Sequence, residues 1–449
     1  MEYAEKDLII NHPKKAINKL SLPIIISLLL MTLNSFIDSA WISGLGTDAL
    51  TAMGFTTPLI FILSSLGNGL GIGTNSIVSR CIGQGDEDNT SNAAIHSIIL
   101  TCFFSIALSV LLLLFLKNIL IFLGAGSVIT YASSYVSIIF AGIIFEYLSI
   151  VLSAIIRSEG AVNKAMYPLI VSTIINIIID PIFIYTFHLG IAGAATATVL
   201  SSVLSLIPLC YWIFIKKNTF VKVDFSKYHR KFSIYWDIFS VGFPACLEVI
   251  IISFVTMFIN SLLFIIDGNM AVAAYGVIMR IFSVFITPVT GIGVANITVV
   301  GTAFGAKLKD NIRTAFNYSN KVSLIVALFT FSILVLFAGN LAGLFANSDT
   351  SSDLNIYIIH IVYILSVSVF TVPLREIAFN ILQAMGKGLT SMCFIILKES
   401  IFTTFAYTFA FYLGMGPDGI YYGMLVGETI GSVIAFAYVY FYIKRLNFS

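Results

Sequence analysis

The sequence has few charged side chains. Only 10% of its 449 residues are Asp, Glu, Lys or Arg, whereas a soluble protein carries about 25%. Hydrophobic residues make up 58%, and the mean hydropathy is +0.99. Because this balance extends along the whole chain, it excludes an ordinary soluble domain. It predicts many membrane-spanning segments and not a single anchor.

Cysteine and histidine are scarce, with five residues of each. The cysteines lie singly in or beside apolar runs, which argues against a disulfide framework and a CxxC metal site. The histidines are not clustered, and there is no HExxH and no GxSxG in a suitable context. We therefore expect neither an enzyme nor a resident cofactor. We also expect no cleavable signal peptide and no nucleic-acid partner.

Twelve apolar stretches are long enough to cross a bilayer, at about 20 residues each. They lie near 17–43, 52–79, 94–116, 128–156, 165–187, 191–215, 237–266, 271–301, 318–345, 355–383, 390–413 and 418–443. This pattern predicts an all-α membrane protein of twelve transmembrane helices in two six-helix lobes. The expected lobes are residues 1–215 and 237–449, joined by a basic linker at 216–236.

The basic residues predict the orientation of these helices. All but four of the 24 Lys and Arg residues fall on the same side of the twelve-helix arrangement. Lys117 lies on the other side, and Arg280, Arg375 and Lys398 lie within predicted helices. Because positive loops stay inside, we expect a multi-pass protein of the cell membrane with both termini and the linker in the cytoplasm.

The two halves of the sequence resemble each other at one constant shift. The matched pairs are Asp38 with Asn260, Gly54 with Gly276, Gly69 with Gly291, Gly71 with Gly293, Gly83 with Gly305 and Asp88 with Asp310. Since each repeat holds an even number of helices, both halves have the same orientation in the membrane. Two such lobes are suited to alternating access.

Several acidic residues lie within the predicted spans. They are Asp38, Glu146, Asp180, Glu248, Glu376, Glu399 and Glu428. A carboxylate at the centre of the bilayer costs about 2.5–3.5 kcal/mol on insertion scales, so each needs a function or a partner. Glu146, Glu376, Glu399 and Glu428 could simply pair with the basic residues inside the helices.

Asp38 and Asp180 are the better functional candidates. Asn34 lies four residues before Asp38, and Asn176 lies four residues before Asp180, so each pair shares one face of its helix. Desolvated carboxylates could bind a proton. Alternatively, they could only tie helices together by hydrogen bonds. Pro181 removes a backbone donor and can kink the fifth helix.

A second reading of the same region is an alkali-cation site. Ala194 and Thr198 are also four residues apart, on the sixth helix. Carboxylate, amide, hydroxyl and backbone carbonyl oxygens could hold Na⁺. The candidate ligands are Asp38, Asn176, Asp180, Thr198 and the carbonyl of Ala194. The sequence leaves the coupling ion open between H⁺ and Na⁺. It predicts one-sided coupling, because Asn260 at the repeat position of Asp38 cannot titrate.

Three stretches resemble one family of membrane proteins. IIRSEGAVNKAMYPLIVSTIINIIIDPIFIYTFHLGIAGAATATVLS (155–202) is similar to the fourth-to-sixth-helix region of the multidrug and toxic compound extrusion (MATE) transporters. FIDSAWISGLGTDALTAMGF (36–55) resembles their first-to-second-helix signature, and VGFPACLEV (241–249) resembles the opening of their seventh helix. The resemblance covers essentially the whole chain in order.

This resemblance implies export of amphipathic, often cationic compounds, driven by inward flow of H⁺ or Na⁺. Asp38 and Asp180 match the paired aspartates of the branch similar to DNA-damage-inducible protein F. Asn176, Ala194 and Thr198 match the surrounding cation site, and Glu248 matches a seventh-helix glutamate of other branches. The tenth-helix aspartate of those branches has no counterpart here. Asn34, Asn260 and Glu248 remain secondary or substrate-site candidates.

We therefore predict a secondary active efflux antiporter that acts by alternating access, as a monomer, on small amphipathic or cationic drugs. The alternative is a flippase for lipid-linked sugars or cell-wall precursors, which would be expected to have a strongly cationic cavity. Acids outnumber bases within the predicted spans, and this favours cationic substrates.

Overall fold

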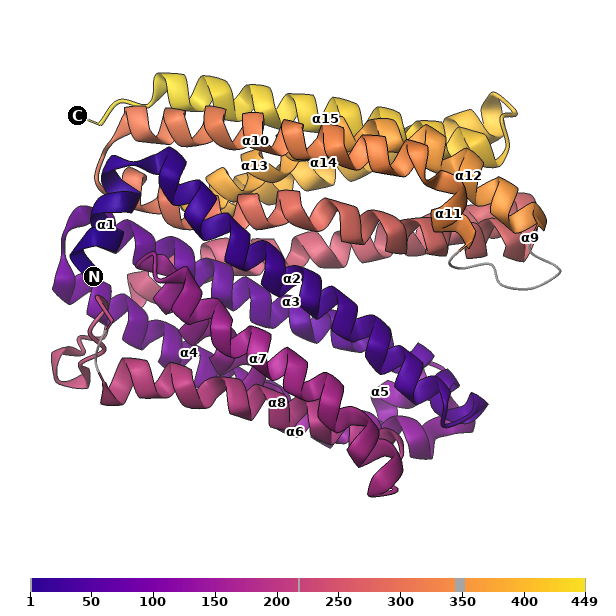
Figure 1. Cartoon of the computed structure of the whole chain (residues 1–449), viewed down its shortest axis with the longest axis horizontal. Coiled ribbons are helices and arrows are strands. Elements are labelled where there is room, and N and C mark those ends of the chain that lie inside the picture. The colour runs from indigo at the N-terminus through magenta and orange to yellow at the C-terminus, as the bar shows by residue number, and fades with distance from the viewer. Residues whose placement is uncertain (1, 217–218, 344–351, 449) are drawn as a thin grey trace.

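The computed structural model describes residues 2–216, 219–343 and 352–448, and within these ranges all regular elements are helices. Both chain ends lie at the same end of the elongated molecule, which we call the terminal end (Figure 1). Before the central loop the helices are α1 (Glu2–Asn11), α2 (Pro13–Ser43), α3 (Thr47–Gln84), α4 (Glu87–Leu114), α5 (Leu116–Phe122), α6 (Ile129–Ser158), α7 (Val162–Pro181) and α8 (Ile191–Cys210). After it they are α9 (Phe232–Gly305), α10 (Lys309–Leu336), α11 (Ala338–Gly343), α12 (Ser352–Ser366), α13 (Val372–Ala384), α14 (Gly388–Tyr407) and α15 (Pro417–Arg445).

α9 is too long to be one membrane span. Its 74 residues would extend about 110 Å at 1.5 Å per residue, whereas the hydrocarbon core is about 30 Å thick. The helix is broken at Gly268, whose φ of 68° and ψ of −152° are not helical. Glycine adopts such a positive φ without a steric penalty. α9 therefore provides the two spans that the hydropathy predicts near 237–266 and 271–301.

The tenth span is broken. α12 and α13 meet at an angle of 45°, with a 3₁₀ turn at Val367–Phe370 between them. Pro373 lies in the first turn of α13, where its missing N–H has no intrahelical partner to lose. The sequence predicts a span near 355–383 in which Pro373 indicates a kink, and the break lies two residues before this proline.

The described chain has the twelve spans expected from the hydropathy. Ten helices are long and apolar enough to cross a membrane, and the α12–α13 pair makes eleven. Counting the two arms of α9 separately gives twelve. The short helices α1, α5 and α11 are additional elements that the sequence does not predict.

The two halves of the chain share a hydrophobic core at the terminal end. This core combines buried side chains from both halves, such as Ile77 of α3 and Val299 of α9. At the opposite end the buried side chains form separate clusters. One extends from Ile42 to Ala195 and the other from Ile259 to Tyr421. Packing between the halves is therefore concentrated at the terminal end.

The repeat is visible in how α3 and α9 cross. A Cβ added to Gly83 would overlap the carbonyl oxygen of Thr302, and a Cβ added to Gly305 would overlap that of Arg80. The two contacts are related by the shift that relates the two halves of the sequence. Because the overlapping atoms are backbone, only glycine permits this crossing.

The central loop is attached to the first half. The side chain of Asn92 donates to the His229 carbonyl (2.9 Å) and accepts from the His229 N–H (3.3 Å). The Lys231 N–H donates to Nε2 of His96 (3.1 Å), and the Val221 N–H donates to Glu159 (2.9 Å). The described part of the linker is thus held against α4 and the end of α6.

Candidate functional site

Asp38 and Asp180 lie in one polar cluster between α2 and α7. The amide of Asn34 donates both to Asp38 Oδ2 (3.0 Å) and to Asn176 Oδ1 (2.8 Å). Asn176 in turn donates to Asp180 Oδ1 (3.2 Å). The two pairs that share helix faces are therefore joined across the helices into one chain of amides and carboxyls.

The cluster is short of hydrogen-bond donors. The carboxyls of Asp38 and Asp180 lie within electrostatic range of each other, and two like charges at short range favour a proton or a cation at the pair. Within the described residues, buried Asn34 Oδ1, Asp38 Oδ1 and Asp180 Oδ2 have no donor. Buried polar atoms are normally satisfied. Three unsatisfied oxygens thus mark a place where a proton or a cation can bind.

Burial differs between the two sides of the cluster. Asp180 is 1% exposed and Asn176 is 3% exposed, whereas Asn34 and Asp38 are half-buried. Asp38 is therefore the more accessible carboxyl. A negative charge on the buried Asp180 is costly without a cation or a hydrogen-bond donor beside it. Such a partner would reach Asp180 either past Asp38 or along α7.

The backbone after Asp180 is irregular. Pro181 is followed by a π-helical turn, Ile182–Thr186, in which the Phe187 N–H donates to the Ile182 carbonyl (2.9 Å). π-Helical turns within α-helices occur frequently at functional sites. Here the turn directly follows the buried carboxylate, so α7 can change its bend beside the site.

The same turn is repeated in the second half, without an aspartate. A π-helical turn at Thr408–Tyr412 follows α14. Gly190 and Gly416 then precede α8 and α15 with nearly equal dihedral angles (φ 57°, ψ −136° and φ 61°, ψ −140°). The backbone is thus symmetric where the acidic side chains are not.

Ala194 and Thr198 are not joined to the aspartates by any hydrogen bond within the described chain. The Thr198 hydroxyl instead donates to the Ala194 carbonyl (3.1 Å), so the two residues are hydrogen-bonded to each other. α8, which carries both, packs along α7. The structure brings four of the predicted residues together and leaves these two bonded to each other.

Tyr135 of α6 is a residue that the sequence reasoning missed. It is 8% exposed and lies within electrostatic range of both Asp38 and Asp180. An aromatic residue in an apolar helix carries no signal of this role in a single sequence, because only tertiary packing brings α6 to α2 and α7.

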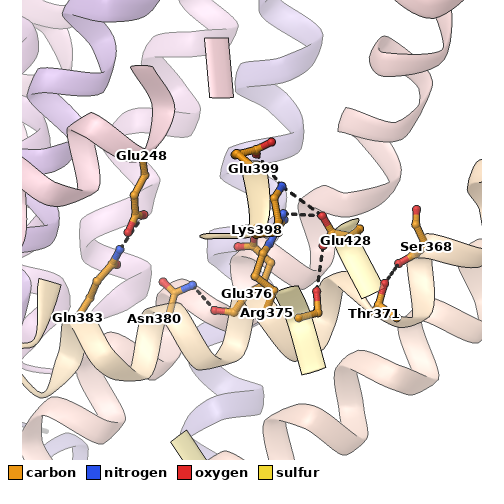
Figure 2. A network of polar contacts seen from close by, with 11 residues as sticks. Glu248, Ser368, Thr371, Arg375, Glu376, Asn380, Gln383, Lys398, Glu399 and Glu428 are labelled. Carbon is orange, nitrogen blue, oxygen red and sulfur yellow. Dashed lines mark hydrogen bonds and ion pairs between the residues drawn. The ribbon is translucent and has the colours of Figure 1, made fainter. Parts of the chain in front are cut away.

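A second polar network lies in the other half of the chain (Figure 2). Arg375 contacts Glu376 (2.8 Å) and Glu428 (3.0 Å), and Lys398 contacts Glu399 (2.7 Å) and Glu428 (3.3 Å). These three glutamates are paired with basic residues, as one reading of the sequence expects. Glu146 is different, because within the described residues its side chain accepts from the Ser64 hydroxyl (3.3 Å) and pairs with no basic residue.

Glu248 and Asn260 belong neither to the Asp38–Asp180 cluster nor to the ion pairs of Arg375 and Lys398. Glu248 accepts from Ser391 (2.7 Å) and Gln383 (3.2 Å), as Figure 2 shows for Gln383. Its carboxylate is therefore already satisfied. Asn260 lies on the first arm of α9, and its buried Oδ1 has no donor among the described residues.

Twelve spans in two repeated halves, with buried carboxyls that lack donors, define a multi-pass membrane transport protein. The MatE family model matches residues 23–182 and 244–408, and the chain belongs to this family of transporters. It is therefore not an enzyme.

Relatives and solved structures agree with this assignment. The chain is 27% identical to "Multidrug export protein MepA" of Staphylococcus saprophyticus, and 26% identical to that of Staphylococcus aureus; each match covers 96% of this chain and 95% of the relative. A MATE structure in complex with MaL6 is 31% identical, with a TM-score of 0.95 over 98% of both chains. An outward-facing multidrug resistance MATE family transporter of the MOP superfamily is 30% identical, with a TM-score of 0.95 over 99% of both chains.

Proposed function

We propose that this protein is a cation-coupled antiporter that exports amphipathic, often cationic compounds. The observation that carries the proposal is the Asp38–Asp180 pair with its three donor-free buried oxygens. The relatives named as multidrug export proteins support the substrate class. The paired aspartates support a place near the branch similar to DNA-damage-inducible protein F.

In this proposal the incoming cation binds between Asp38 and Asp180. A proton would bridge the two carboxyls directly. Na⁺ would instead use their oxygens with Asn176, the Ala194 carbonyl and Thr198, since oxygen atoms are the ligands that hard cations take. The Thr198 hydroxyl donates to the Ala194 carbonyl, which leaves lone pairs on both oxygens for Na⁺.

Cation binding would be converted into movement through α7. The π-helical turn after Pro181 lies next to the site, so neutralising Asp180 can change the bend of α7 and release the substrate. The moving units would be residues 1–215 and 237–449, joined by the linker 216–236. We propose that both termini lie in the cytoplasm and that the protein works as a monomer. With that orientation, packing between the halves at the terminal end corresponds to an outward-facing state.

The test is transport of a fluorescent cationic dye, added outside, into everted membrane vesicles. A proton gradient and a Na⁺ gradient are imposed separately, and the initial rate of dye transport is measured for each. We expect one gradient to drive transport and the Asp38→Asn, Asp180→Asn double variant to lose it while remaining in the membrane. Full transport by the double variant would overturn the proposal.

A further inference from the structure

A cavity of about 200 Å³ lies entirely within the second half of the chain. It is formed by α9, α12, α13, α14 and α15, so it contains no residue of the Asp38–Asp180 cluster. Its walls are apolar and aromatic; they include Tyr275, Met279, Phe282, Phe402 and Met424. Such walls suit the apolar body of an amphipathic ligand.

One side of this cavity is charged. Arg375, Lys398, Glu399 and Glu428 all line it. Glu376 does not line the cavity but pairs with Arg375. Together with Glu376, the network has three carboxylates and two basic groups. When all are ionised the network has an excess negative charge. Uncompensated charge in a buried site is costly, and a bound cation would compensate it.

The glycines of α15 place this network. Gly419, Gly423, Gly427 and Gly431 recur every fourth residue on one face of the helix. A Cβ at Gly423, Gly427 or Gly431 would overlap α14, and one at Gly419 would overlap the π-helical turn Thr408–Tyr412 that follows it. Small residues at this spacing let membrane helices approach closely. At Gly431 the overlapping group is the Lys398 side chain. The glycine thus lets the lysine stem pass α15 and reach Glu428.

Glu399 is the carboxylate that can be released. Glu428 accepts from Arg375 (3.0 Å), Lys398 (3.3 Å) and Ser432 (3.1 Å). Among the described residues, Glu399 pairs with the Lys398 ammonium alone, at 2.7 Å. Because Lys398 already contacts both carboxylates (Figure 2), it can shift fully to Glu428 without losing its charge partner. Glu399 would then face the cavity with a free negative charge.

We propose that this cavity is a second ligand site, which binds an organic monocation by exchanging Lys398 for the ligand's charge at Glu399. Phe282, Phe402 and Tyr275 surround the apolar part and attract the cation through their ring faces. The cavity is smaller than the roughly 300–1,000 Å³ of pockets for drug-sized ligands. It takes a compact cation or the cationic end of a larger one. The inference rests on the proposed function only in assuming that exported cations are the ligands.

The experiment measures binding of benzyltrimethylammonium to the full-length, detergent-purified chain by titration calorimetry, with no ion gradient. This probe has one aromatic ring and a permanent positive charge. We expect one molecule bound per chain, and no binding of benzenesulfonate, which has similar size and opposite charge. No binding of benzyltrimethylammonium by the unaltered chain would overturn the proposal.

Three variants locate the site. Glu399→Gln should weaken binding at least tenfold. Glu146→Gln, which removes a partly buried carboxylate in the first half, should leave affinity within twofold. Met279→Trp should fill the cavity and abolish binding without touching the ion pairs, which keeps the test decisive if Glu399→Gln fails to fold. Unchanged affinity in Met279→Trp would overturn the proposal.

The Asp38→Asn, Asp180→Asn double variant separates the two proposals. We expect it to bind the probe within twofold of the unaltered chain while its gradient-driven transport is lost. Loss of probe binding in this variant would place the ligand in the first half and contradict the second site. Retained transport would contradict the proposed coupling and leave the second site standing.

Discussion

Asn34 of α2 donates a hydrogen bond to Asn176 of α7 across 2.8 Å. Through this amide pair, the two helices that carry Asp38 and Asp180 are joined at the level of their carboxyls. A movement of either helix therefore changes the hydrogen bonding of both aspartates. This relationship is the basis on which cation binding can be linked to helix movement.

The first prediction concerns this amide pair. Asn34→Leu removes the donor to both Asp38 and Asn176, and we expect gradient-driven dye transport to fall at least fivefold. Two hydrogen bonds are lost, at about 1 kcal/mol each, so we expect the variant to fold. The control is Ser39→Ala on the same helix, whose hydroxyl bonds only its own helix at Ser35. Equal transport by both variants would contradict the role of Asn34.

The second prediction concerns the bend of α7. Pro181→Ala restores a backbone donor beside the π-helical turn, so it should stabilise a regular helix there. We expect a higher thermal unfolding temperature together with slower dye transport. Pro208→Ala, the proline within α8, is the control and should leave the transport rate within twofold. Faster transport by Pro181→Ala would show that the irregular turn is not needed.

The third prediction concerns the crossing of α3 and α9. Gly83→Ala places a methyl group against the backbone oxygen of Thr302, so we expect it to open the terminal end. Cys246 is 2% exposed and lies against Ser65 across the two halves. In a chain that keeps only this cysteine, maleimide labelling should rise severalfold. Gly54→Ala is the control, since nothing lies within 4 Å of its added methyl. Unchanged labelling in Gly83→Ala would contradict the predicted closure.

The fourth prediction concerns Glu428. Glu428→Gln leaves Arg375 and Lys398 buried with one fewer counter-charge, and breaking a buried ion pair costs about 3–5 kcal/mol. We expect a clear drop in the thermal unfolding temperature. Glu146→Gln removes a carboxylate that accepts from Ser64 and pairs with no basic side chain of the described residues, so it should change the unfolding temperature much less. An equal drop in both variants would mean that the ion pairs contribute little.

Much of the fold could be predicted from the sequence, because hydropathy and helix length are local properties. They predict the twelve spans, and the repeated glycines predict the relation of the halves. Pro373 indicates the bend near Thr371, but the short helices α5 and α11 were not predicted. Their formation depends on packing at the ends of the spans, for which hydropathy gives no signal.

The candidate site was only partly predictable. Four-residue spacing places Asn34 with Asp38 and Asn176 with Asp180 on single helices, but the bond between the pairs depends on how α2 and α7 pack. Tyr135 reaches the site from α6 and has no local signal. In the second half, the sharing of Lys398 between Glu399 and Glu428 depends on the close approach of α14 and α15. The spacing of the glycines on α15 was the available signal for that approach.

The central claim is that coupling belongs to the first half alone. It is tested most directly by measuring gradient-driven dye transport in everted vesicles for Asp38→Asn and for Glu248→Gln at equal amounts of protein. Glu248 is already satisfied by Ser391 and Gln383, and the repeat position of Asp38 holds the non-titrating Asn260. We expect Asp38→Asn to transport no faster than vesicles without the protein, and Glu248→Gln to keep at least half of the unaltered rate. Transport by Asp38→Asn with none by Glu248→Gln would contradict the account.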